Sequence, residues 1–172
     1  ARRLRADLTA AVVVSAVVAP RADGEAMTTK TRRLWRHLVT DRADVNRAFS
    51  SADLQRIEAA VAASERRHVG QICVAIEAAM PVARVWQGVT PRERALEVFG
   101  LLRVWDTECN DGVLVYLLLA DKDVEIVADR GINALVEAAA WETICRGMES
   151  AFRAGRFTEG LETGIAAISD LM

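Results

Sequence analysis

The sequence predicts an α/β domain in which helices pack around a small mixed β-sheet. Segments with helical periodicity alternate with short strand-like segments along the chain, which is the pattern of layered α/β folds. Residues 71–78 include β-branched residues and apolar groups on both faces, which is typical of a strand buried on both faces. Two later strand-like segments are separated by only two residues, which predicts an antiparallel hairpin in the same sheet.

The composition fits one globular domain with a sizeable core and a tail. The chain has 172 residues, of which 52% are hydrophobic and 27% charged. The net charge of −2 gives no indication of a nucleic-acid partner. The charge is uneven, because residues 27–103 carry 13 basic and 8 acidic side chains whereas residues 104–130 carry 2 basic and 7 acidic ones. We expect the acidic segment to attract cations.

The chain divides into an N-terminal extension (residues 1–26), an N-terminal helical segment (27–47) and the α/β domain (48–172). The extension is either disordered or signal-like, since basic residues precede the apolar run Ala10–Ala19 and small residues follow it. That run is too short to span a bilayer, so no membrane span is expected. Three cysteines without metal-ligand spacing favour a reducing compartment. We expect a cytoplasmic protein, or an exported one if the extension acts as a signal.

The first helix of the domain begins at Ser50, whose side chain can cap it, and Asp53 follows three residues later. Its apolar face contains Leu54, Ile57 and Val61, and Gly70 ends it. The strand at residues 71–78 follows, and then a loop at residues 81–88.

The clearest helix start is at Thr90, with Pro91 at the first helical position and Glu93 completing a capping box. After this helix an acidic loop leads into a strand at residues 113–120, a turn at 121–122 and a strand at 123–128. Two helices complete the chain. Their apolar faces contain Trp141, Cys145, Met148 and Phe152 in the first helix and Leu161, Ile165, Ile168 and Met172 in the second.

The acidic loop, WDTECNDG at residues 105–112, is the first candidate site. Its oxygen donors are Asp106, Glu108, Asn110 and Asp111, and oxygen ligands are what hard cations prefer. The loop is not an EF-hand, because its glycine is seventh and no acid stands twelfth. Two interpretations remain open: a solvated acidic turn, or part of a site for a hard cation.

A short hairpin returns the end of its second strand to the beginning of its first. Asp129 is therefore expected near the acidic loop, where it could add a carboxylate from across the ladder. Arg130 could instead pair with Asp111, in which case the two would form a structural salt bridge at a strand end.

Glu65 and His68 are spaced to share a helix face, which is a metal-ligand arrangement in helical bundles. His68 near a helix C-terminus is equally explained by the helix dipole. Glu77, at the C-terminal end of its strand, lies where α/β sheets place ligands.

Nucleophilic catalysis has little support in the sequence. It contains no G-x-S-x-G motif and no phosphate-cradling glycine loop. Cys109 lies among acids, which disfavour a thiolate. Aromatic residues are 5% of the chain, so a base-stacking surface for nucleic acid is not expected.

Residues 94–132, RALEVFGLLRVWDTECNDGVLVYLLLADKDVEIVADRGI, resemble the TPM domain family, whose members include a thylakoid-lumen acid phosphatase and a photosystem II repair factor. The N-D-G-V-L entry into a strand, the D-R-G after the hairpin and the later G-R-F carry the resemblance, which covers residues 48–171. The W-D-T-E phrase is similar to the short, single-domain bacterial branch.

The resemblance implies a three-layer α/β/α sandwich with helices on both faces of the sheet. It also implies loosely bound Ca²⁺ or Mg²⁺ near the loop end of the sheet, and a weak phosphatase activity in some members. By position, Asp106, Asn110 and Asp111 match the acidic loop of the family and Asp129 its hairpin acid. Gln71 stands where the short branch has a glutamate, which puts any role for a carboxylate there in doubt.

Two functions are therefore expected as alternatives. The first is a divalent-cation-binding domain, in which Glu108 could act as a base for a weak phosphatase and the supporting residues would be Arg130, Glu65, His68 and Glu77. The second is a non-enzymatic domain with a structural acidic loop and a surface for a protein partner.

Overall fold

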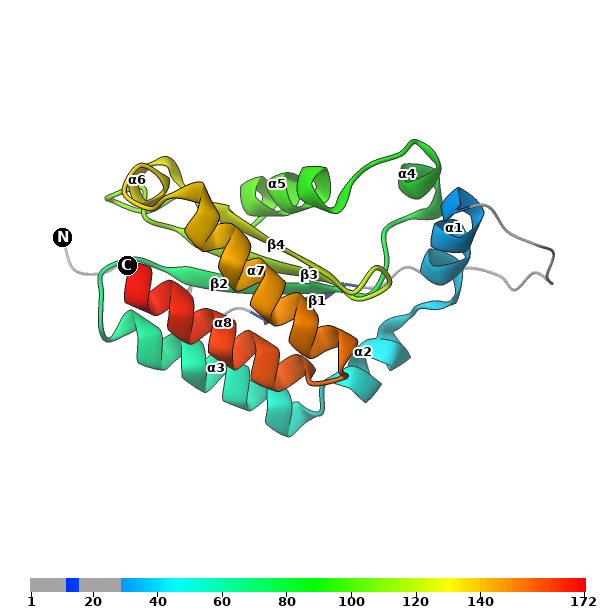
Figure 1. Ribbon diagram of the computed structural model, residues 1–172, viewed down its shortest axis with the longest axis horizontal. Coiled ribbons are helices and arrows are strands. Elements are labelled where there is room, and N and C mark those ends of the chain that lie inside the picture. Colours follow the sequence, from blue (N-terminus) through cyan, green and yellow to red (C-terminus); the bar gives the residue numbers. More distant parts are fainter. Residues whose placement is uncertain (1–11, 16–28) are drawn as a thin grey trace.

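The computed structural model describes residues 12–15 and 29–172 as a sheet between two layers of helices (Figure 1). The strands are β1 (Val12–Ser15), β2 (Ile72–Glu77), β3 (Val113–Leu118) and β4 (Asp123–Ala128). The helices are α1 (Thr29–Val39), α2 (Arg42–Ala48), α3 (Ser51–Glu65), α4 (Val82–Trp86), α5 (Pro91–Leu101), α6 (Arg130–Asn133), α7 (Ala138–Arg153) and α8 (Phe157–Leu171). The predicted α/β/α sandwich is confirmed.

The sheet is mixed, with the strand order β1-β2-β3-β4. β2 pairs in parallel with β1 and with β3, while β3 and β4 are antiparallel. All six side chains of β3 are buried, because this strand has neighbours on both sides and helices over both faces.

Alternate side chains of each strand feed two separate cores. Val115 of β3 and Ile126 of β4 face the layer formed by α3, α7 and α8. Leu114 and Tyr116 of β3 face the opposite layer, where α1, α4 and α5 lie. The strand period of two therefore supplies an apolar set to each layer.

The helix starts that the sequence marks are observed. Ser50 and Asp53 form the capping box of α3, and Thr90 and Glu93 form that of α5, with Pro91 at the start of the helix. Each box satisfies two N–H groups that a helix start leaves without partners.

The structure differs from the prediction at four places. β1 pairs with β2 inside the segment that the sequence set apart from the domain, since a run of β-branched residues suits a strand as well as a signal. The expected loop at residues 81–88 contains α4. α3 ends at Glu65, so His68 lies in the following turn and not on the helix.

The fourth difference is the hairpin turn, which has four residues, 119–122, in place of two. Leu119 and Ala120 donate their N–H groups to the carbonyls of Glu77 and Ala78, so they remain beside the β2 segment before the chain turns. Lys122 adopts a positive φ of 52° to complete the turn.

Candidate functional site

The acidic loop and the end of β4 meet at one end of the sheet, as the hairpin predicted. Val113 pairs with Ala128, and the Asp129 N–H donates to the Gly112 carbonyl at 2.8 Å. On the other side of β3, the Val113 N–H donates to the Gln71 carbonyl at 2.8 Å. The segments around Gln71, Gly112 and Asp129 therefore lie side by side at this end of the sheet. We call this region the loop end.

Asn110 joins the acidic loop to α6. Its carbonyl accepts hydrogen bonds from the N–H groups of Gly131 at 2.9 Å and Ile132 at 3.3 Å. Its side-chain Oδ1 accepts from Arg130 Nε at 3.1 Å. Asn110 has a φ of +54°, which asparagine tolerates better than most residues.

Two glycines allow this close packing. A Cβ at Gly131 would lie 2.3 Å from the Cys109 carbonyl oxygen, and one at Gly112 would lie 1.9 Å from that of Val104. Both distances are too short for any side chain, so the N-D-G and D-R-G phrases are required for the loop to contact the hairpin.

Asp129 caps α6 and holds a carboxylate oxygen away from water. Its Oδ1 accepts from the Arg130 N–H at 2.7 Å. Its Oδ2 is buried and has no hydrogen-bond partner among the described residues. A buried carboxylate oxygen without a donor is costly, so this atom indicates a missing partner.

The other loop acids differ in their surroundings. The Asp111 N–H donates to Thr107 Oγ1 at 3.0 Å, and its Cβ lies close to Gly70. Asp106 pairs with Arg103 at 2.7 Å, and both side chains are more than half exposed. Glu108 is exposed. The structure thus places Asn110 beside α6 and the backbone of Asp129 beside Gly112, while Asp111 lies beside Gly70 on the β2 side and Asp106 forms a local ion pair at the surface.

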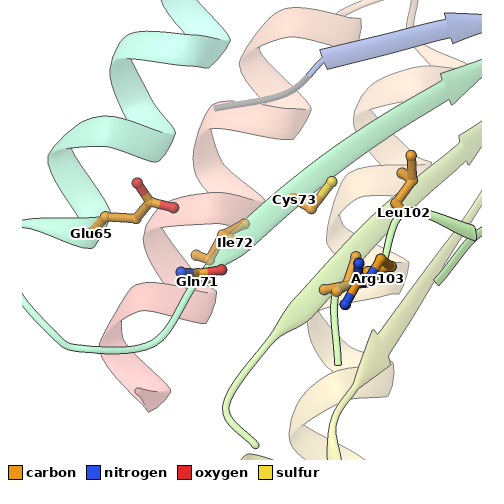
Figure 2. A pocket seen from close by; sticks show the side chains of 7 residues that line it. Glu65, Gln71, Ile72, Cys73, Leu102 and Arg103 are labelled. Atoms are coloured by element: carbon orange, nitrogen blue, oxygen red, sulfur yellow. The ribbon is translucent and has the colours of Figure 1, made fainter. Parts of the chain in front are cut away.

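Glu65 and Gln71 line a small pocket beside the start of β2 (Figure 2), with Cys73, Leu102 and Arg103 among the other lining residues. Figure 2 shows the Glu65 carboxylate reaching from α3 toward the β2 segment. The pocket has a volume of about 20 Å³, which is room for one water molecule. Burial raises the pKa of Glu65 despite the Ile72 N–H and His68, and burial with the nearby Glu65 raises the pKa of Cys73 to about 11.

Both ring nitrogens of His68 have partners within its own turn. One ring nitrogen lies 2.8 Å from Ser64 Oγ, and the other lies 3.0 Å from the Gly70 carbonyl oxygen. A metal ligand needs one ring nitrogen free for the ion. His68 therefore shapes the turn before β2 and does not pair with Glu65 as a ligand set.

The family model for the TPM domain matches residues 39–171, which includes every segment of the loop end. The chain belongs to the TPM domain family. No curated protein matches it.

Three solved structures share the fold of this TPM domain. The BA42 protein of the psychrophilic bacterium Bizionia argentinensis is 28% identical, with a TM-score of 0.64 over 72% of this chain and 80% of that one. An N-terminal domain from P. gingivalis is 18% identical, with a TM-score of 0.58 over 72% and 75%. The N-terminal domain of cg2496 from Corynebacterium glutamicum is 12% identical, with a TM-score of 0.53 over 71% and 72%. The last two bear on the fold alone.

Glu77 of the TPM domain lies at the opposite end of β2 from the loop end. It is buried, and it accepts hydrogen bonds from Arg94 at 2.9 and 3.0 Å and from the Tyr116 hydroxyl at 2.5 Å. Six residue steps along the strand separate Glu77 from Gln71, or roughly 20 Å. The structure therefore does not bring Glu77 to the loop acids. Its carboxylate is paired with Arg94 inside the fold.

A second buried ionic cluster was missed in the sequence. His37 is buried, its Nδ1 accepts from the Met80 N–H at 3.0 Å, and its Nε2 lies 3.2 Å from Asp121. Arg33 and Arg36 also bind Asp121, each at 2.9 Å. Burial acts to raise the pKa of Asp121, but His37 and Arg33 lower it below its usual value. The available signal was an aspartate directly after a buried strand, opposite an amphipathic segment that carries a histidine.

The loop end fits a hard cation only in part. Among the described residues, no group of three or more His, Cys, Asp or Glu side chains lies close enough to hold a metal ion. The oxygen donors that the loop end offers are the side chains of Asp129, Asp111 and Asn110 and backbone carbonyls. This donor set fits a cation that keeps several water ligands, as Mg²⁺ and weakly bound Ca²⁺ do.

Proposed function

We propose that this TPM domain binds a divalent cation, Ca²⁺ or Mg²⁺, loosely at the loop end. The observation that carries the proposal is the buried Oδ2 of Asp129, which has no hydrogen-bond donor among the described residues. A cation supplies the charge that this oxygen needs, and carboxylate oxygens are preferred ligands of both ions. Asn110 and Asp111 are the proposed neighbouring ligands.

Weak binding follows from the same residues. Two carboxylates and an amide give few charged ligands, and affinity for these ions rises with ligand charge. Arg130 already donates to Asn110 Oδ1, so an incoming cation competes with a guanidinium. Asp106 is not among the proposed ligands, because its carboxylate pairs with Arg103.

The proposed function is cation binding without catalysis. A phosphatase needs an activated nucleophile or a positioned water near a substrate pocket. The pocket beside Glu65 has room for one water molecule, and the pKa values of Cys73 and Cys145 are raised to about 11, which keeps both thiols protonated. The phosphatase activity that the family resemblance implies stays a prediction, and Glu108 stays its candidate base.

Calorimetric titration of the protein and two variants tests the proposal. Asp129→Asn keeps the helix cap, since asparagine caps as well as aspartate, but it removes the buried charge. Asp106→Asn is the matched control, because it removes the same charge from the exposed Arg103 pair. We expect Ca²⁺ binding with a Kd of about 10⁻⁴–10⁻³ M, the range of weak oxygen-ligand sites.

Asp129→Asn should weaken this binding at least about tenfold, which corresponds to about 1.4 kcal/mol. Asp106→Asn should change it by less than about threefold, as expected for a screened surface charge. Absence of binding heat at millimolar Ca²⁺ and Mg²⁺ would reject the site. It would favour the alternative of a protein-interaction domain with a structural acidic loop.

A further inference from the structure

The end of the molecule opposite the loop end carries a surplus of positive charge. It is formed by α1, α2, α4 and the turn between β3 and β4, which lie together at that end in Figure 1. Residues 29–48 and 121–122 alone contain seven bases and three acids. The bases are Lys30, Arg32, Arg33, Arg36, Arg42, Arg47 and Lys122, and the acids are Asp41, Asp44 and Asp121. We call these residues, together with α4, the basic end.

The three acids of the basic end are already engaged within the fold. Asp121 is bound by α1, and its side chain is only 8% exposed. Asp41 caps α2, where it accepts hydrogen bonds from two backbone N–H groups. Asp44 pairs with Arg47 one turn further along the same helix. The carboxylates of this end are therefore directed to partners of their own.

Most of the bases have no such partner. Four of them are exposed and make no ion pair with a described residue, namely Lys30, Arg32, Arg42 and Lys122. They come from three separate elements, α1, α2 and the β3–β4 turn. A broad surface with unpaired positive charge at this end attracts an anionic partner.

α1 presents bases outward because its apolar face is already packed. Leu34 and His37 are buried against the domain, at 8% and 2% exposure. Arg32, Arg36 and Val39 follow one another at helical spacing and are exposed, so they share the outer face of the helix. α1 is therefore an amphipathic helix whose charged side, and not its apolar side, is available to a partner.

Trp86 adds an apolar group to this basic surface. The side chain of this α4 residue is 63% exposed, and Lys30 Nζ lies 5.0 Å from the centre of its ring. An indole combines an apolar body with one polar N–H group, and tryptophan is enriched where the hydrocarbon of a bilayer meets its headgroups. A lysine beside such a ring lies at the level of lipid phosphates.

A bilayer surface accounts for these features better than a nucleic acid or an acidic peptide. The charges are spread over three elements and do not line a single groove, as binding of one peptide segment would require. One exposed ring at this end does not make a stacking surface for bases. The acidic loop end lies on the far side, so the asymmetry of charge turns the basic end toward an anionic surface.

We propose that the basic end docks this domain on the surface of a bilayer that contains anionic lipids. Lys30, Arg32, Arg42 and Lys122 lie against the headgroups, and the Trp86 ring enters the interface. The contact is peripheral, because the apolar face of α1 stays packed on the domain. It does not depend on a cation at the loop end.

Cosedimentation with lipid vesicles tests the proposal. One set of vesicles is phosphatidylcholine mixed with phosphatidylglycerol, and the control set is phosphatidylcholine alone. EDTA is present throughout, so that a divalent cation cannot bridge the loop end to the lipid. The expected result is binding to the anionic vesicles alone, which weakens as salt is added.

Two charge variants locate the contact. Arg32→Gln combined with Arg42→Gln should weaken vesicle binding about fivefold for each charge, or about 25-fold in total. The matched control is Arg66→Gln combined with Arg146→Gln, which removes two exposed bases from α7 and the end of α3. The control should change binding by less than about twofold, because these bases lie outside the basic end.

Tryptophan fluorescence reports on the depth of the contact. Anionic vesicles should shift the emission of the protein to shorter wavelength as the Trp86 indole leaves water. Trp86→Phe should abolish this shift and retain most of the binding, since phenylalanine keeps an apolar ring.

Three results would overturn the proposal. The first is no binding to anionic vesicles, or equal binding to both sets. The second is an equal loss of binding in the two charge variants, which would indicate that only the net charge matters. The third is binding of heparin that depends on Arg32 and Arg42 while vesicles leave Trp86 emission unchanged, which would assign the basic end to an anionic polymer.

Discussion

Asp123 begins β4 with its carboxyl half-buried among other acids. Because burial and these neighbours raise its pKa to about 6 in the folded protein, the folded state holds this proton more tightly than the unfolded chain does. Stability from this group is therefore present below about pH 4 and is lost as the pH rises to about 6.

Asp123→Asn should consequently stabilise the protein at neutral pH and leave it unchanged in acid. After allowance for the exposed half of the side chain, we expect about 1 kcal/mol at pH 7.5 and about zero at pH 4. Urea denaturation of both proteins at the two pH values measures this. An equal effect at both pH values would contradict the electrostatic cause.

The buried carboxylate of Glu77 is stabilised by its ion pair with Arg94. Arg94→Met keeps the aliphatic stem but leaves the carboxylate with the Tyr116 hydroxyl alone. The side chains of Glu77 and Arg94 are 6% and 22% exposed, so we expect a loss of about 3 kcal/mol, the low end for breaking a buried pair.

The control is Glu77→Met combined with Arg94→Met, which removes both charges. This double variant should recover most of the loss in urea denaturation, because no unpaired charge remains in the core. A double variant as unstable as Arg94→Met alone would show that packing, and not the charge, is responsible.

At the level of single residues, the sequence predicted where a residue lies in the fold better than which side chains it contacts. Asp129 was placed opposite the acidic loop by hairpin geometry alone, and the structure confirms it. The contacts of Arg130 with Asn110 and of Asp106 with Arg103 were not predicted, since side-chain pairing depends on loop conformations such as the positive φ of Asn110 and Arg103.

At the level of elements, α1 docks onto the sheet through His37. The Met80 N–H can donate only to an unprotonated Nδ1, so the Nε2 of the neutral ring donates to Asp121. His37→Phe fills the space but leaves the buried Met80 N–H without an acceptor, which should cost about 2 kcal/mol.

Hydrogen exchange measures the local effect of this change. Amides of α1, residues 29–39, should exchange faster in His37→Phe, while those of β3 change only as global stability does. Arg36→Gln is the control, because Arg36 is half exposed and Asp121 keeps Arg33. Unchanged exchange in α1 would mean that His37 does not anchor this helix.

Elements with caps or long periodic faces were predictable, and short ones were not. Thr90, Pro91 and Glu93 marked α5 from the sequence, and the structure has the same capping box. α4 has five residues and no side-chain cap, so neither signal existed for it. The hairpin turn was predicted too short, because its length is set by the hydrogen bonds of Leu119 and Ala120 to the β2 segment.

At the level of the whole molecule, the acidic segment at residues 104–130 does not form one site. Its strands carry the acids to different places: Asp111 and Asp129 to the loop end, Asp121 to the His37 cluster, and Asp123 and Glu125 to a groove between β4 and α7. Acids close in sequence are separated because a β-strand extends by about 3.3 Å per residue. None of the described helices has the length and apolar character needed to cross a bilayer.

A specific cation site and an unspecific attraction to acidic side chains predict different positions for a bound ion. A cation bound at the loop end lies near Asn110 and Asp129, whereas one attracted only by charge gathers at the carboxylates of Asp123 and Glu125. Both regions are acidic, so affinity alone does not separate them. The position of the ion does.

Paramagnetic broadening of amide signals by Mn²⁺, a hard divalent cation that accepts the same oxygen ligands, gives that position directly. The account predicts that substoichiometric Mn²⁺ broadens the amides of Asn110, Asp111 and Asp129 first, that excess Ca²⁺ or Mg²⁺ restores them, and that Glu77 is unaffected. Broadening centred on Asp123 and Glu125, or none at all, would contradict it.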